Sequence, residues 1–67
     1  MEEIIFIVEE SEEGGFTARA LGNSLFTEAD TYIELREAVK DAVKCHFDDD
    51  KQYIIRLHLV KEEVFAA

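Results

Sequence analysis

The chain has 67 residues, 48% of them hydrophobic, and no proline, a composition typical of one small folded domain. Sixteen acidic residues against seven basic ones give a formal net charge of −9, which disfavours direct binding to nucleic acids or to acidic membranes. The longest apolar run, residues 4–8, is too short to span a membrane, and the single cysteine, Cys45, agrees with a reducing compartment. We therefore expect a single cytoplasmic domain, 1–67, that self-associates because its core is worth only roughly 3 to 5 kcal/mol.

Three short strands are predicted in the first half of the chain. Residues 3–9 contain the continuous, mostly β-branched apolar run 4–8 between two glutamates, which indicates a strand in the middle of a sheet. The glycine pair 14–15 ends a polar turn, and residues 16–20 then alternate between apolar and polar as a second strand. Residues 22–23 mark another turn before a third strand over 24–29. This pattern predicts a three-stranded meander.

A single helix is predicted from residue 31 to about residue 47. Thr31 and Glu34 have the spacing of a capping box, in which the threonine hydroxyl and the glutamate carboxylate satisfy free backbone amides. At about 100° per residue, one face of this helix is apolar. Its central line holds Leu35, Val39, Ala42 and His46, with Tyr32, Ala38 and Val43 beside them. The helix should therefore cover one face of the sheet.

Three further side chains have expected positions that bear on function. Ile33 points toward the charged side of the helix, either as an ordinary exposed aliphatic side chain or as part of an oligomer contact. His46 lies near the centre of the apolar line, where we expect a neutral, hydrogen-bonded side chain in the core or in an interface. His58 alternates with apolar residues and should lie on the outer face of the sheet. Neither histidine has the setting of a catalytic base.

The last strand is predicted over residues 53–60, after a connection that contains the aspartates at 48–50. The element order is then β-β-β-α-β, and a right-handed crossover places the last strand parallel to the first and beside it. The predicted fold class is α+β, with two layers, one helix packed on one face of the sheet, and strand order 3-2-1-4. Residues 61–67 form a tail that we expect to be a short turn or helix.

Excess negative charge is expected at both ends of this sheet. Carboxylates from the first turn, from the residue before the helix and from the tail gather at one end, and those of residues 2–3 and 48–50 gather at the other. An acidic end can steer a basic protein partner toward the domain. Loops and strand ends are also where ordinary solvated charge gathers, so the pattern leaves both interpretations open.

No catalytic, metal-binding or cofactor-binding site is predicted. Cys45 and His46 are adjacent, but neighbouring residues of a helix point about 100° apart, so they are poor partners for nucleophilic catalysis. One cysteine and two histidines are too few for zinc, which needs about three or four converging ligands. A strand, and not a helix, follows the glycine pair 14–15, which is therefore a turn and not a phosphate-binding loop.

Nearly the whole chain resembles the N-terminal domain of HicB-like antitoxins, most closely the short single-domain members of that group. The segments that carry the resemblance are IIFIVEE at 4–10, EGGFTARALG at 13–22, FTEADT at 26–31, DAVKCHF at 41–47 and IIRLH at 54–58. Each motif is degenerate, but their order and spacing together are fairly specific. The chain departs from the pattern at the turn 21–24, which lacks the usual proline, and at Ala29, where a glycine is usual.

The resemblance implies a partial ribonuclease H-like fold and an antitoxin role, so the leading hypothesis is a non-enzymatic module, which we expect to form a homodimer or higher homo-oligomer. It also implies that the module binds a small basic toxin ribonuclease and masks its active site. The C-terminal DNA-binding domain of full-length antitoxins is not expected in a chain that ends at Ala67. The carboxylates expected to contact the toxin are Glu12, Glu13, Glu28, Asp30, Glu62 and Glu63. The alternatives are an accessory domain that self-associates or binds a small ligand beside His46 or His58, and a weak nuclease dependent on His46.

Overall fold

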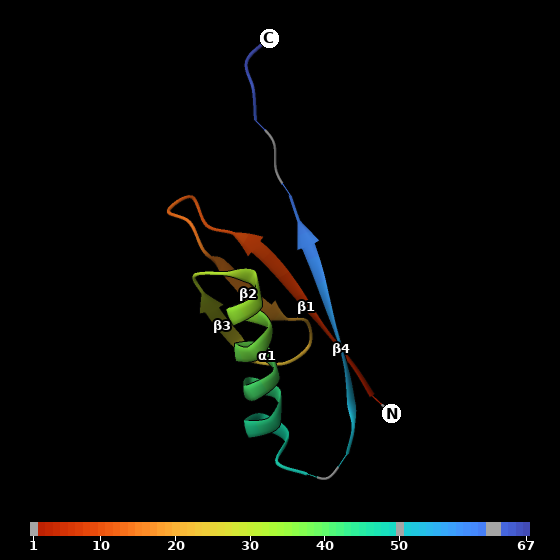
Figure 1. The fold of residues 1–67 in the computed structure, drawn as a ribbon. Coiled ribbons are helices and arrows are strands. Elements are labelled where there is room, and N and C mark those ends of the chain that lie inside the picture. The colour runs from red at the N-terminus through yellow and green to blue at the C-terminus, as the bar shows by residue number, and fades with distance from the viewer. Residues whose placement is uncertain (1, 50, 62–63) are drawn as a thin grey trace.

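Four strands and one helix follow one another in the predicted order β-β-β-α-β (Figure 1). The computed structural model describes residues 2–49, 51–61 and 64–67. The elements are β1 (Glu2–Glu10), β2 (Phe16–Ala20), β3 (Phe26–Ala29), α1 (Tyr32–Phe47) and β4 (Tyr53–Val60). Strand β3 begins later than the predicted residue 24. Leu25 lies outside β3, although its carbonyl accepts a hydrogen bond from the Ala20 amide at 3.0 Å in the register of the β2–β3 pair.

The strands form one mixed sheet with the order β3-β2-β1-β4, which confirms the predicted topology. Phe6 of β1 lies opposite Ala20 of the antiparallel strand β2 and opposite Leu57 of the parallel strand β4. A parallel neighbour requires the chain to return to the starting end of β1, and α1 makes that return. As a result β1 is a central strand, while β3 and β4 form the two edges of the sheet.

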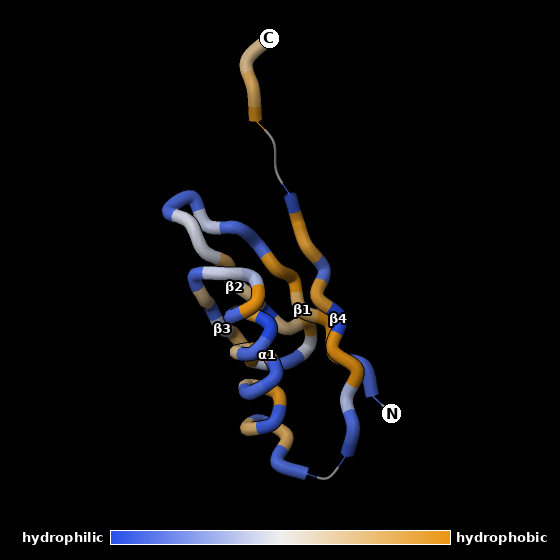
Figure 2. The backbone as a smooth tube through the Cα atoms, viewed as in Figure 1, coloured by the Kyte–Doolittle hydropathy of each residue, from blue (hydrophilic) through white to orange (hydrophobic). Residues whose placement is uncertain are grey.

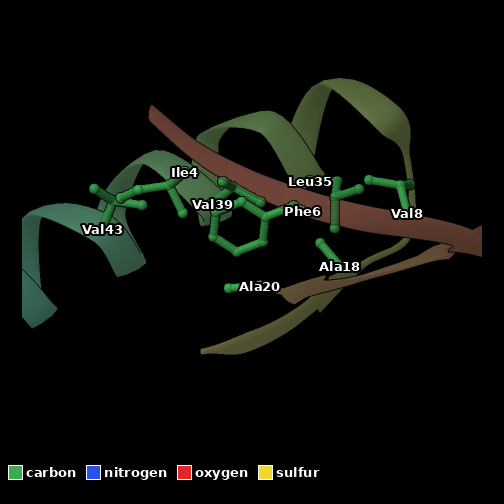
Figure 3. Packing of buried hydrophobic residues seen from close by; sticks show 8 residues of the cluster. All are labelled: Ile4, Phe6, Val8, Ala18, Ala20, Leu35, Val39 and Val43. Carbon is green, nitrogen blue, oxygen red and sulfur yellow. The ribbon is translucent and has the colours of Figure 1, made fainter. Parts of the chain in front are cut away.

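The hydrophobic core lies between α1 and one face of the sheet (Figure 3). Its buried residues are Ile4, Phe6, Val8, Ala18, Ala20, Leu35, Val39 and Val43. The strand residues alternate along β1 and β2 because side chains of a strand point to opposite faces in turn, and the helix residues are four apart on one ridge of α1. No layer among the described residues covers the opposite face, so Ile5 and Ile7 are only half-buried there.

The apolar line of α1 differs from the predicted one at its C-terminal end. The buried ridge passes through Val43 to Phe47, which packs against the core and stacks on Tyr53 with ring centroids 4.6 Å apart. His46 is exposed and not in the core, and its ring stands edge-on to that of Phe47 at 4.8 Å. A step of four residues turns a helix by about 400°, so the contact ridge drifts around α1 and leaves His46 outside it.

Several exposed parts of the chain bear on the predictions. Ile33 and His58 are exposed as expected, and His58 lies on the outer face of the sheet, opposite the half-buried Ile7. Lys61 and residues 64–67 adopt neither a turn nor a helix, and the end of the chain extends away from the sheet (Figure 1). Within the described residues, no helix has the length and apolar character needed to cross a membrane.

Candidate functional site

An acidic hollow lies where the turn between β1 and β2, the end of β3 and the start of α1 meet. It has a volume of about 560 Å³ and is open to solvent. Four of its lining residues are acidic, and they are Glu13 in the turn, Glu28 in β3, Asp30 just after β3, and Glu34 in the first turn of α1. We take this acidic hollow, defined by the four carboxylates, as the candidate site.

The turn between β1 and β2 is held in place by hydrogen bonds and by close packing against β3. The Ser11 amide donates to the Gly15 carbonyl at 2.9 Å, and the Gly14 amide donates to the Ser11 carbonyl at 3.0 Å. Both glycines have a φ of 89°, which residues with a side chain rarely adopt. A Cβ atom on Gly15 would lie only 2.9 Å from the Ala29 carbonyl oxygen. This close approach brings Glu13 to the same hollow as the carboxylates of the β3 end.

Thr31 caps the start of α1 beside the acidic hollow. The Glu34 amide donates to Thr31 Oγ1 at 3.1 Å, as the predicted capping box requires. The Thr31 hydroxyl donates in turn to Glu34 Oε1 at 3.1 Å, so this carboxylate accepts its hydrogen bond from the hydroxyl and not from the backbone amide that was expected. The partial positive charge at a helix start stabilises carboxylates nearby. The fold therefore tolerates acidic side chains at this end.

Half of the carboxylates predicted to bind a partner share the acidic hollow. Those that do are Glu13, Glu28 and Asp30. Glu12 lines a different hollow, between the β1–β2 turn and the chain that follows β4, together with Lys61. The two remaining predicted residues, Glu62 and Glu63, lie outside the described residues.

Glu34 belongs to the acidic hollow but was not among the predicted partner-binding residues. The capping-box spacing contains the signal that could have found it. Residue 34 stands in the first turn of the helix, and the hydrogen bonds with Thr31 hold it at the same end of the domain as Asp30. A capping glutamate can thus also be a surface carboxylate of a binding site.

The residues of the acidic hollow are suited to electrostatic attraction. In the part of the chain that the structure describes, no group of three or more His, Cys, Asp or Glu side chains could hold a metal ion. Cys45 and His46 lie at the opposite end of α1, and His58 lies on β4, so none of these lines the hollow. Carboxylates exposed around an open hollow can bind cationic side chains of another protein.

Two side chains of β4 have shifted pKa values, and both lie outside the acidic hollow. Partial burial raises the pKa of Tyr53 to about 12, together with the hydrogen bond that its hydroxyl donates to Asp49 Oδ2 at 2.8 Å. The hydrogen bond from Arg56 Nη2 to Glu3 Oε2, at 3.0 Å, raises the pKa of the Arg56 guanidinium. Both side chains are protonated at neutral pH with their ordinary pKa values, and the shifts move these pKa values further from neutrality, so neither side chain is prepared for proton transfer.

Comparison with known proteins finds two related sequences of similar extent. A UPF0150 protein from Thermotoga maritima is 45% identical over 64 residues, which make up 96% of this chain and 91% of the relative. A UPF0150 protein from Archaeoglobus fulgidus is 55% identical over 49 residues, or 73% of each of the two chains. No family model matches the sequence, and no solved structure matches it.

Proposed function

The chain belongs to the UPF0150 family, and we propose that it is a non-enzymatic, HicB-like antitoxin-type module. In this role it binds a small basic toxin ribonuclease and masks the active site of that enzyme. The ordered motifs that resemble HicB-like domains support the proposal. The β-β-β-α-β fold with strand order 3-2-1-4 agrees with the topology that the resemblance implies.

The observation that carries the proposal is the convergence of carboxylates in the acidic hollow. Glu13, Glu28 and Asp30 come from separate places in the sequence, and the folded chain brings them to one open surface with Glu34. The chain as a whole carries a net charge of −9, so its field attracts a basic protein over a longer range than a single ion pair does.

Binding at the acidic hollow would inhibit a ribonuclease by direct competition. An enzyme that cleaves RNA must attract phosphate groups, so its substrate surface carries lysine and arginine side chains. The carboxylates of the hollow present negative charges to the same side chains. A toxin surface covered in this way cannot bind RNA at the same time, and inhibition requires no chemical step by this chain.

A binding experiment with matched variants tests the proposal. The chain is coexpressed with a candidate partner, a small basic protein encoded by a neighbouring gene, and the affinity of the complex is measured by calorimetry. Three exposed charge pairs at roughly 0.5 kcal/mol each sum to about 1.5 kcal/mol, so neutralising them should weaken binding about tenfold. The hollow variant is Glu13→Gln, Glu28→Gln and Asp30→Asn.

The control variant removes the same charge elsewhere and consists of Glu2→Gln, Glu37→Gln and Asp41→Asn. These three side chains are exposed and do not line the hollow. The control should retain most of the affinity, and raising the salt concentration should weaken every complex. If no complex forms at low salt, or if the control weakens binding as much as the hollow variant does, the proposal fails.

A specific observation also favours the alternative of an accessory domain that self-associates. Exposed apolar side chains gather on β4, an edge strand that pairs with β1 and with no other strand of the described residues. Exposed apolar edges are places where protein chains pair with one another. Mass measurement of the chain alone tests this candidate function, which does not exclude toxin binding at the acidic hollow.

A further inference from the structure

A groove separates α1 from the first half of β4. Its volume is about 650 Å³, and the lining residues that belong to the core or pack against it are Val39, Val43, Tyr53, Ile55 and Leu57. The groove exists because α1 lies over β2 and β3 while β4 runs beside it (Figure 1). The side chains of β4 that face the helix side are consequently only half-buried, and Leu59 is 54% exposed.

The rim of this groove is basic, although the chain as a whole is strongly acidic. Arg36, Lys40 and Lys44 are spaced four residues apart, so they form one stripe along α1, and Lys51 lies two residues before β4. These four residues are more than half of the seven basic residues in the chain, and among the residues that the structure describes no acidic one lines the groove with them. The groove is therefore suited to a segment that is both acidic and apolar.

The segment that follows β4 has this character. Its sequence is Glu62-Glu63-Val64-Phe65, which combines two carboxylates with two large apolar side chains. Val64 is 82% exposed and Phe65 is 79% exposed, and Figure 2 shows the apolar end of the chain standing away from the sheet. The end of the chain leaves β4 in the direction away from the groove of the same chain. The segment is therefore better placed to bind the groove of a second copy than its own.

We propose that a second copy of this chain pairs with the free edge of β4 and places its residues 62–65 in the groove. The two β4 strands run antiparallel about a two-fold axis at Leu57, which joins the two sheets into one. Residues directly opposite each other then have numbers that sum to 114. The proposal gives a structure to the self-association described above, and it uses a surface separate from the acidic hollow.

This register places apolar side chains opposite apolar side chains on both faces of the joined sheet. On the helix side, Ile55 lies opposite Leu59 of the second copy. On the outer side, Ile54 lies opposite Val60 of the second copy, and these side chains are 48% and 45% exposed in the single chain. A register centred on Arg56 would instead bring two guanidinium groups together and place Ile54 opposite His58 and Val60 opposite Gln52, which disfavours it.

The same register brings the acidic segment to the basic groove. Lys61 lies opposite Tyr53 of the second copy, and Tyr53 lines the groove, so the segment after Lys61 starts at the edge of the second copy's groove. Four extended residues reach about 13 Å. This reach is more than twice the about 4.8 Å between paired strands, so it is enough to lead from the strand edge into the groove beside Lys40 and Lys44.

Disulfide trapping of the chain alone tests the register. In a Cys45→Ser background, the double variant Ile54→Cys with Val60→Cys should form disulfide-linked dimers, because opposite residues of antiparallel strands have Cα atoms about 4.5 to 5.5 Å apart, a separation that a disulfide can bridge. Each single variant should remain unlinked, and so should Arg56→Cys. Linked dimers from Arg56→Cys alone, or a native chain with the 7.7 kDa mass of a monomer at all concentrations, would overturn the proposal.

Charge reversal tests the groove. The variant Lys40→Glu with Lys44→Glu should weaken the dimer about tenfold or more in analytical ultracentrifugation, and circular dichroism should report unchanged helix content. Adding Glu62→Lys and Glu63→Lys should restore the dimer, whereas Arg19→Glu, on the outer face of β2, should leave it unchanged. Failure of the second pair to restore dimerisation would contradict docking of residues 62–65. These measurements contain no toxin, so their outcome is independent of the proposed function.

Discussion

Alanine at Gly15 is expected to destabilise the domain much more than alanine at Gly14. The two glycines are neighbours in the turn that carries Glu13 to the acidic hollow, and both have a φ of 89°. They differ in their surroundings. A Cβ atom on Gly14 meets no atom within 4 Å, whereas a Cβ atom on Gly15 meets the Ala29 carbonyl oxygen at 2.9 Å.

The expected magnitudes follow from this difference. The left-handed backbone costs an alanine about 1 to 2 kcal/mol, and the smaller freedom of the unfolded chain offsets about 0.4 to 1 kcal/mol of that. Gly14→Ala should therefore lower the free energy of unfolding by about 1 kcal/mol. At Gly15 the crowded atom belongs to the backbone and cannot rotate away, which adds about 1 to 3 kcal/mol. Gly15→Ala should therefore cost about 2 to 4 kcal/mol, a large part of the stability expected for so small a domain.

Thermal unfolding followed by circular dichroism measures this difference at equal protein concentrations. For a domain of this size, 1 kcal/mol corresponds to a shift of about 4 to 8 °C in Tm. Gly15→Ala should thus melt at least about 4 °C below Gly14→Ala, and its loosened turn should also weaken binding at the acidic hollow. Equal Tm values for the two variants, or a lower Tm for Gly14→Ala, would refute the packing argument.

Two further predictions concern the helix cap and the pH dependence of β4. Thr31→Ala removes the acceptor of the Glu34 amide and should cost about 1 kcal/mol in chemical denaturation, while Thr31→Ser should retain most of the stability; equal losses would contradict the cap. Tyr53 should titrate near pH 12 by phenolate absorbance in a Tyr32→Phe background, and Asp49→Ala should lower that midpoint. Because the folded-state pKa exceeds the ordinary value of 10, the stability contributed by Tyr53 is present below pH 10 and is lost between pH 10 and 12; a wild-type midpoint near 10 would contradict this.

The candidate site could be predicted only in part. The turn glycines, the residue before the helix and the strand order were enough to place Glu13 and Asp30 at one end of the sheet. They were not enough to separate Glu12, which is adjacent in the sequence but lines another hollow. Consecutive residues in a turn can point to opposite sides, and the close packing of Gly15 against β3 decides which of them faces the site.

The sequence by itself determined the order of the elements, the strand order and the cap of α1. Strand alternation, helix periodicity and turn glycines are local signals, and the right-handed crossover then leaves one position for β4. Only the tertiary structure decided how α1 lies on the sheet. Its ridge ends on Phe47 and leaves His46 exposed, and its position over β2 and β3 opens the basic groove beside β4. The reason is that helix placement depends on how all the core side chains fit together, which no local pattern contains.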